Sequence, residues 1–77
     1  MKKTEFLGRI GELVGADPQS IAGGDTLMSL SGWDSVAVVG FLALCDEDFG
    51  VQVKPDDIAE CRTVDDLCSL VPGKLTD

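Results

Sequence analysis

The sequence contains no histidine, and basic side chains are few. Without histidine, neither a Ser-His-Asp triad nor a Cys-His pair can form, which removes the commonest routes to nucleophilic catalysis. Only 6 lysines and arginines stand against 14 aspartates and glutamates, so the formal net charge is −8. Affinity for nucleic acid comes mainly from basic contacts to phosphate, so we expect no nucleic-acid partner. The excess of negative charge instead favours basic surfaces on partner proteins.

Long apolar runs and paired cysteines are also missing. The longest nearly apolar segment, residues 36–45, is too short to span a bilayer, so we expect no membrane partner. An amphipathic segment follows the amino-terminal Met-Lys-Lys, and we therefore expect no signal peptide. The three cysteines form no Cys-x-x-Cys pair, which argues against a metal site. These features predict a reduced, cytoplasmic monomer.

The length of 77 residues predicts a single domain, residues 1–77, with only a small core. Apolar periodicity and helix-stop residues predict an all-α fold of four helices. The expected helices cover residues 4–14, 35–49, 55–60 and 63–71. A long loop, residues 16–33, joins the first two helices, and the third helix is short. Leu27, Leu30 and Trp33 are spaced three apart in this loop, and we interpret them as anchors that pin it to the core.

The boundaries of the later helices have recognisable residues. Asp34 or Ser35 can cap the second helix, and Gly50 can end it. Thr63 and Asp66 resemble a capping box at the start of the fourth helix.

The second helix carries no charge from residue 36 to residue 45, so both of its sides are apolar. At about 100° per residue, one side is a normal core face; it consists of Val38, Val39, Leu42, Cys45 and Phe49. The opposite side consists of Val36, Ala37, Gly40, Leu44 and Glu47, with Phe41 flanking it. Three other short helices cannot cover both, so we expect part of this second side to be an exposed binding surface. Phe41→Glu or Leu44→Glu should then leave the fold intact. The alternative is that the loop of residues 16–33 covers this second side of the helix and buries it more tightly.

Ser35 is the remaining candidate for chemistry. Ser and Asp before a helix are most often plain caps, so Asp34-Ser35 alone means little. Its placement between a long anchored loop and an apolar helix is more informative. A phosphodiester on the Ser35 hydroxyl would lie at a helix N-terminus, where free N–H groups and the helix dipole favour an anion. Asp34 is close enough to help hold a divalent cation during such a transfer.

In these features the sequence resembles the acyl carrier protein family over nearly its whole length. The family's Asp-Ser-Leu attachment motif corresponds to Asp34-Ser35-Val36. The other matching segments are Asp25-Thr26-Leu27 and Leu30 in the loop, Asp46-Glu47-Asp48-Phe49-Gly50 at the end of the second helix, and Thr63-Val64 at the start of the last.

The resemblance implies a four-helix bundle of acyl-carrier type that is not itself an enzyme. It implies that a phosphopantetheinyl transferase attaches 4′-phosphopantetheine covalently to Ser35 from coenzyme A. Acyl groups would be held as thioesters on that arm and presented to acyl-loading and acyl-processing enzymes. The second helix would be the main docking surface, aided by the acidic third helix. The residues expected at this surface are Val36, Ala37, Gly40, Phe41, Leu44, Glu47, Asp56 and Asp57.

Some positions depart from the family pattern. Val36 replaces the usual Leu, and Ala37 and Gly40 stand where many fatty-acid carriers have acidic or polar residues. Trp33 before Asp-Ser is more similar to stand-alone carriers of polyketide, peptide or modified-lipid synthesis. We therefore favour a specialised carrier. The alternatives are a housekeeping carrier of fatty-acid synthesis, and a helical adaptor that uses the same surface without a prosthetic group.

Overall fold

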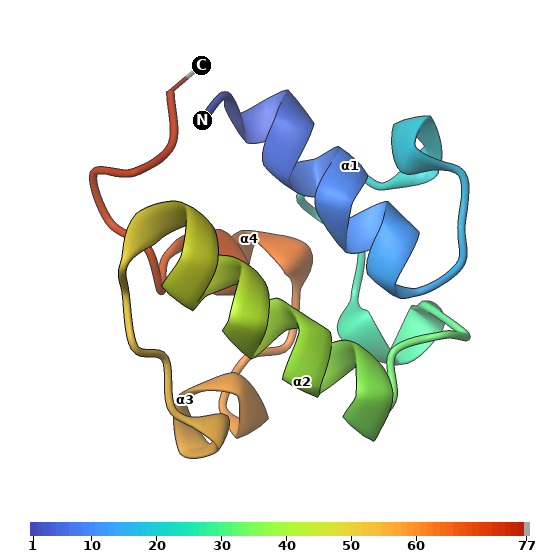
Figure 1. Cartoon of the computed structure of the whole chain (residues 1–77). Helices are drawn as coiled ribbons and strands as arrows, with labels where there is room; N and C mark the ends of the chain where they lie inside the picture. Colours follow the sequence, from blue (N-terminus) through green and yellow to red (C-terminus); the bar gives the residue numbers. More distant parts are fainter. Residues whose placement is uncertain (77) are drawn as a thin grey trace.

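The computed structural model describes residues 1–76, without the side chain of Pro18. Four α-helices and three short helical turns follow one another along the chain (Figure 1). In order, they are α1 (Lys3–Leu13), η1 (Pro18–Ser20), η2 (Leu27–Ser29), α2 (Ser35–Leu44), η3 (Cys45–Phe49), α3 (Pro55–Ala59) and α4 (Val64–Cys68). The predicted all-α class, the long loop between the first two helices and the short third helix are confirmed.

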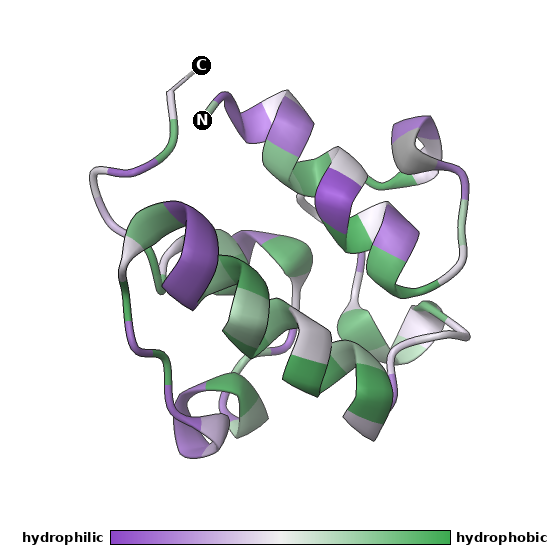
Figure 2. Ribbon diagram, in the orientation of Figure 1, coloured by the Kyte–Doolittle hydropathy of each residue, from purple (hydrophilic) through white to green (hydrophobic). Residues whose placement is uncertain are grey.

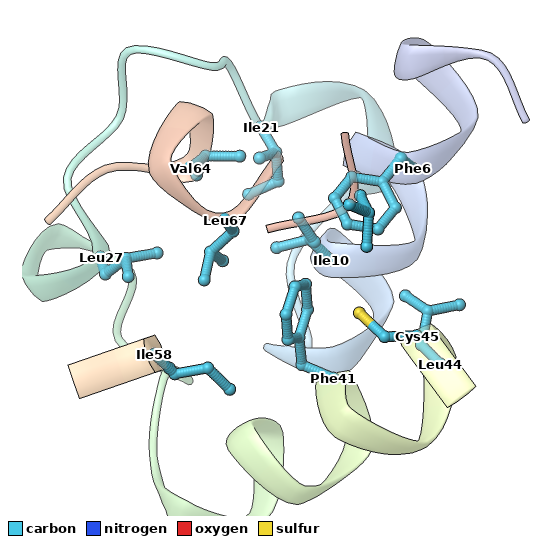
Figure 3. Packing of buried hydrophobic residues seen from close by; sticks show 11 residues of the cluster. Phe6, Ile10, Ile21, Leu27, Phe41, Leu44, Cys45, Ile58, Val64 and Leu67 are labelled. Carbon is cyan, nitrogen blue, oxygen red and sulfur yellow. The ribbon is translucent and has the colours of Figure 1, made fainter. Parts of the chain in front are cut away.

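The core is built from side chains that meet between α1, α2 and α4 (Figure 3). Phe6, Phe41, Val64 and Leu67 are completely inaccessible to solvent. The Phe6 and Phe41 rings pack edge to face with their centroids 5.8 Å apart. Full burial of one such side chain contributes about 1.5–3 kcal/mol relative to exposure, so these contacts dominate the stability of a small bundle.

The long loop is held against α4 by its backbone. The Leu27 N–H donates to the Arg62 carbonyl at 2.8 Å, and the Val64 N–H donates to the Asp25 carbonyl at 3.0 Å. Leu27 is buried, and Leu30 and Trp33 are partly buried against the core. The predicted role of these three residues as loop anchors is therefore confirmed, and the loop reaches α2 as a fixed segment.

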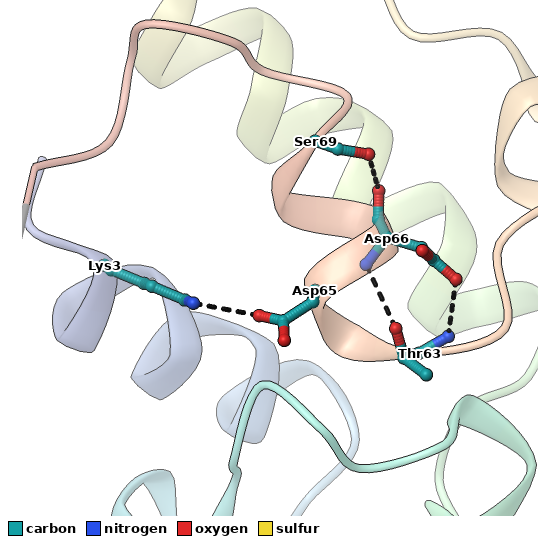
Figure 4. Close-up of polar contacts among 5 residues, drawn as sticks. All are labelled: Lys3, Thr63, Asp65, Asp66 and Ser69. Atoms are coloured by element: carbon teal, nitrogen blue, oxygen red, sulfur yellow. Dashed lines mark hydrogen bonds and ion pairs between the residues drawn. The ribbon is translucent and has the colours of Figure 1, made fainter.

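The predicted start of α4 is confirmed by a complete capping box (Figure 4). The Asp66 N–H donates to the Thr63 hydroxyl at 3.2 Å, while the Asp66 carboxylate accepts from the Thr63 N–H at 3.1 Å and the Arg62 N–H at 2.9 Å. These two backbone hydrogen bonds lower the pKa of Asp66, because they stabilise its ionised form. On the same helix, Asp65 forms an ion pair with Lys3 at 2.9 Å, which ties α4 to the start of α1.

The second helix begins at the predicted residue, but its last turn is a π-helix and not an α-helix. The Asp34 carboxylate accepts a hydrogen bond from the Ala37 N–H at 3.0 Å, so Asp34 is the cap. The α-helix ends at Leu44, and one wider π-helical turn continues it to Phe49. Gly50 ends that turn with a φ of 67°, a left-handed conformation that glycine adopts without a Cβ clash.

The predicted assignment of the two sides of α2 is wrong for several residues. Ala37, Phe41 and Leu44, expected on an exposed side, are 1%, 0% and 5% exposed and belong to the core. Val39, expected in the core, is 65% exposed. Figure 2 shows why periodicity fails here: the ribbon of α2 is apolar around most of its length, so the sequence does not mark which side faces inward.

The side of α2 that faces solvent is rotated about the helix axis relative to the predicted exposed side. The rotation is smaller than the angle of about 100° between successive residues of a helix. Phe41 lies between the rings of Phe6 and Trp33, at centroid distances of 5.8 Å and 6.2 Å. This aromatic packing determines the rotation of α2 about its axis. The burial of Phe41 and Leu44 removes the basis for expecting that Phe41→Glu and Leu44→Glu leave the fold intact. Each would place a charge in the core, so we now expect both to disrupt the fold.

Candidate functional site

Ser35 is the first residue of α2, and its side chain is exposed. Among residues 1–76, no group forms a hydrogen bond with its hydroxyl. The Ala37 N–H donates to the Asp34 carboxylate and the Val38 N–H to the Asp34 carbonyl, so among the described residues only the N–H groups of Ser35 and Val36 remain without a hydrogen bond in the first turn. Free N–H groups at the start of a helix favour a bound anion. The hydroxyl is therefore exposed at the start of a helix and forms no hydrogen bond within the described residues.

Asp34 keeps one carboxylate oxygen for other contacts. Its Oδ1 caps α2 by accepting from the Ala37 N–H, and this bond fixes the backbone next to Ser35. Its Oδ2 forms no hydrogen bond within the described part of the chain. The side chain is exposed, so this second oxygen is accessible from solvent.

The outer side of α2 forms a narrow apolar stripe, which we call the α2 stripe and define as Val36, Val39 and Ala43. Val36 is 76% exposed and Val39 is 65% exposed, and Ala43 is also exposed. Met28, in the loop that leads to α2, is 98% exposed. These apolar side chains are left largely uncovered by the fold, which is a feature of surfaces that contact other molecules.

Sequence reasoning missed Val39, Ala43 and Met28 as surface residues. The sequence did contain a signal for Val39 and Ala43. Asp46 and Glu47 follow these two residues at spacings of three to eight positions, which places them on the same side of the helix. Charged residues mark the solvent side of a helix, so the acids beyond the apolar segment indicate its outer face.

The other predicted surface residues lie in different surroundings. Gly40 is half-buried, beside a groove of about 200 Å³ between α1 and α2. Glu47, Asp56 and Asp57 are exposed. Asp57 also accepts a hydrogen bond from the Lys54 N–H at 3.2 Å, which closes the start of α3. Of the predicted docking residues, Val36 and these three acids are thus exposed, Gly40 is half-exposed, and the three core residues of α2 are not accessible.

The protein thiols are poorly suited to carry an acyl group. Burial, with a smaller contribution from the nearby Asp48 carboxylate, raises the pKa of the Cys45 thiol to about 11. Burial also raises the pKa of the Cys61 thiol, and nearby acids add to this effect. Burial raises the pKa of the Cys68 thiol as well, although the positive charge of Lys3 partly offsets it. The thiolate is the nucleophilic form, so all three thiols are weak nucleophiles at neutral pH.

Comparison with known proteins identifies the family. The family model described as phosphopantetheine attachment site matches residues 5–71. The chain belongs to this family. It is therefore a non-catalytic carrier whose prosthetic group is 4′-phosphopantetheine, and Ser35 and Asp34 lie within the matched region. No curated protein and no solved structure matches the chain.

The residues at the start of α2 fit this prosthetic group. The carrier needs an accessible hydroxyl for a phosphodiester, and Ser35 provides one. The phosphodiester keeps one negative charge, which the helix N-terminus stabilises. When bound, the group supplies a terminal thiol that forms thioesters. Within residues 1–76 of this carrier, no helix is long and apolar enough to cross a membrane.

Proposed function

We propose that Ser35 carries the 4′-phosphopantetheine arm and that the protein holds acyl intermediates on it as thioesters. The observation that supports this assignment is the exposed, unbonded Ser35 hydroxyl at the first position of α2. In the loading reaction, the Ser35 oxygen forms a bond to phosphorus of coenzyme A while adenosine 3′,5′-bisphosphate leaves. The hydroxyl proton passes to a base on the phosphopantetheinyl transferase.

We further propose that Asp34 acts beside Ser35 during this transfer. One of its oxygens caps the helix, and the other is free to help hold a divalent cation brought by the transferase. The cation would neutralise the phosphate charges close to the reacting hydroxyl.

The α2 stripe is proposed as the docking surface for the transferase and for acyl-loading and acyl-processing enzymes. It begins one residue after Ser35, so a partner bound there has its active site close to the arm. Glu47, Asp56 and Asp57 would add contacts to basic residues at the edge of the partner surface.

We place the carrier in a specialised pathway that makes a polyketide, peptide or modified lipid. No residue of α2 is charged, so docking to this helix rests on apolar contacts and not on ion pairs. A housekeeping role in fatty-acid synthesis is the alternative, and it would require partners that do not depend on charges along α2.

The test is to incubate the purified protein with coenzyme A and a broad-specificity phosphopantetheinyl transferase and to measure the intact mass. We expect one phosphopantetheine to be added to the wild-type protein and none to Ser35→Ala. No gain by the wild-type protein, or a gain that survives Ser35→Ala, would contradict the assignment. Partner binding that Ser35→Ala leaves unchanged would favour an adaptor.

A further inference from the structure

The loop that precedes Ser35 approaches α1 very closely at Gly32. A Cβ atom at this position would lie 2.6 Å from the Val14 carbonyl carbon and 2.8 Å from the Val14 Cα, and closer still to the Val14 oxygen. These are backbone atoms, which cannot rotate aside as a flexible side chain would. The φ angle of Gly32 is not in the left-handed region, so glycine is required here for space and not for conformation.

The next residue, Trp33, holds the same segment against α2. The Trp33 ring packs edge to face on the Phe41 ring of α2, with centroids 6.2 Å apart. The Trp33 N–H donates to the Leu30 carbonyl at 3.0 Å, which closes a turn in the backbone. Residues 30–33 are thus held between the end of α1 and the core side of α2. We call this arrangement the loop seat.

Little chain separates the loop seat from the proposed attachment residue. Three residues span at most about 10 Å, and one of them, Asp34, is already fixed by its hydrogen bond to the Ala37 N–H. A displacement of Gly32 away from Val14 would therefore act on the Asp34 cap and on the first turn of α2, where Ser35 lies, with few residues in between to accommodate it.

We propose that Gly32 and Trp33 are positioning residues that hold the Ser35 hydroxyl in the geometry needed for phosphopantetheine transfer. The proposal rests on the proposed role of Ser35 as the attachment residue. Val39 and Ala43, which form most of the α2 stripe, lie beyond the first turn of α2, where Phe41 and Leu44 hold the helix in the core. A disturbed loop seat should therefore reduce the turnover rate of the transferase more than the binding of the carrier.

The experiment compares Gly32→Ala with Gly24→Ala in steady-state transfer from coenzyme A, followed by intact mass. Gly24 is a matched control, because it lies in the same loop and a Cβ atom there meets no other atom within 4 Å. For Gly32→Ala we expect a fall in kcat of about tenfold or more with little change in KM, since misplacing a reacting group by about 1 Å can cost up to about a hundredfold. For Gly24→Ala we expect a rate within about twofold of wild type, as for other surface substitutions.

The fluorescence of Trp33, the only tryptophan, reports on the loop seat independently of activity. In Gly32→Ala its emission should shift to the red, while the helical circular dichroism stays that of the wild type. If Gly32→Ala does not fold, Trp33→Phe provides the second test, because it keeps an aromatic ring but changes its contact with Phe41; its kcat should also fall several-fold.

The outcomes separate the two proposals. If the wild-type protein gains no arm, or Ser35→Ala still gains one, the assignment of Ser35 as the attachment residue is wrong. The positioning proposal depends on that assignment and is then overturned as well. If the wild type and Gly24→Ala are modified on Ser35 and a folded Gly32→Ala is modified equally fast, the attachment residue stands and the positioning proposal is overturned. Transfer to Trp33→Phe at the wild-type rate, where Gly32→Ala is unfolded, overturns it as well.

Discussion

The hydroxyl of Ser35 and the thiols of the three cysteines differ in both burial and ease of reaction. Cys45 is completely buried, and its pKa of about 11 leaves almost no thiolate at neutral pH. Ser35 is exposed and free of hydrogen bonds within the described residues. In the proposed loading reaction, a transferase that supplies its own base would therefore meet an accessible hydroxyl at this end of α2, and the carrier would need no activated residue of its own.

Phe41 is the residue on which the largest stability effect is expected. Its ring contacts both Phe6 and Trp33 and is fully buried, so Phe41→Ala removes contacts of α2 with α1 and with the loop seat. We expect a loss of about 3–5 kcal/mol in the free energy of unfolding, measured by urea denaturation. At about 0.05–0.15 kcal/mol per residue, a chain of 77 residues has a total stability of about 4–12 kcal/mol, so this loss is a large part of it.

Val39→Ala is the control on the same helix. Its side chain is 65% exposed, and we expect a change within about 0.5 kcal/mol. Equal shifts in the urea midpoints of the two variants would show that the buried side of α2 is not the one described above.

At the scale of single elements, α2 combines two roles that most surface helices keep apart. Its inner side, with Ala37, Phe41 and Leu44, completes the core. Its outer side, the α2 stripe, is also apolar and remains in contact with solvent. Because Val39 is largely exposed, its side chain contributes much less to stability than that of Phe41, and its apolar character fits the docking role that we propose for the α2 stripe.

Val39→Glu tests this interpretation of the α2 stripe. A charge at the centre of the stripe should weaken apolar docking and lower kcat/KM for the transferase by about tenfold or more, since each 1.36 kcal/mol of lost transition-state binding is one factor of ten. The thermal midpoint of unfolding should change little, because the side chain is exposed.

Gln52→Glu adds the same charge at another exposed position and should leave kcat/KM nearly unchanged. A transfer rate for Val39→Glu equal to that of Gln52→Glu would remove the α2 stripe from the docking surface of the transferase.

At the scale of the whole molecule, acidic residues outnumber basic ones by more than two to one. The ion pairs Lys3–Asp65 and Arg9–Asp48 join different helices but are partly exposed, and such pairs contribute about 0–1 kcal/mol each. Repulsion among the remaining acids opposes folding and is screened by salt. The net effect of electrostatics on the bundle is therefore expected to be destabilising at low ionic strength.

Raising NaCl from about 10 mM to about 1 M shortens the Debye length from about 30 Å to about 3 Å and should raise the thermal midpoint. The double variant Asp46→Asn and Glu60→Gln should show a smaller rise. It removes two exposed acids near helix C-terminal ends, where negative charge is unfavourable. A midpoint that falls as NaCl is added would mean that the ion pairs outweigh the repulsion.

The local features of this protein were determined by its sequence. Asp34 before α2, Gly50 after η3 and the pair Thr63 and Asp66 at α4 act within a few residues of their own position, and the predicted caps and stops lie where they were expected. Ser35 could be singled out for the same reason, because its position at a helix start after a long loop is a property of the chain itself.

Only the tertiary structure decided which side of α2 faces the core and why Gly32 is a glycine. A helix that is apolar all round has no internal signal for its rotation about its axis. This rotation follows from the packing of Phe41 against Phe6, in another helix, and Trp33, in the preceding loop. The space available at Gly32 is likewise set by the Val14 backbone, at the end of another helix. Both are contacts between distant segments, which the order of neighbouring residues does not contain.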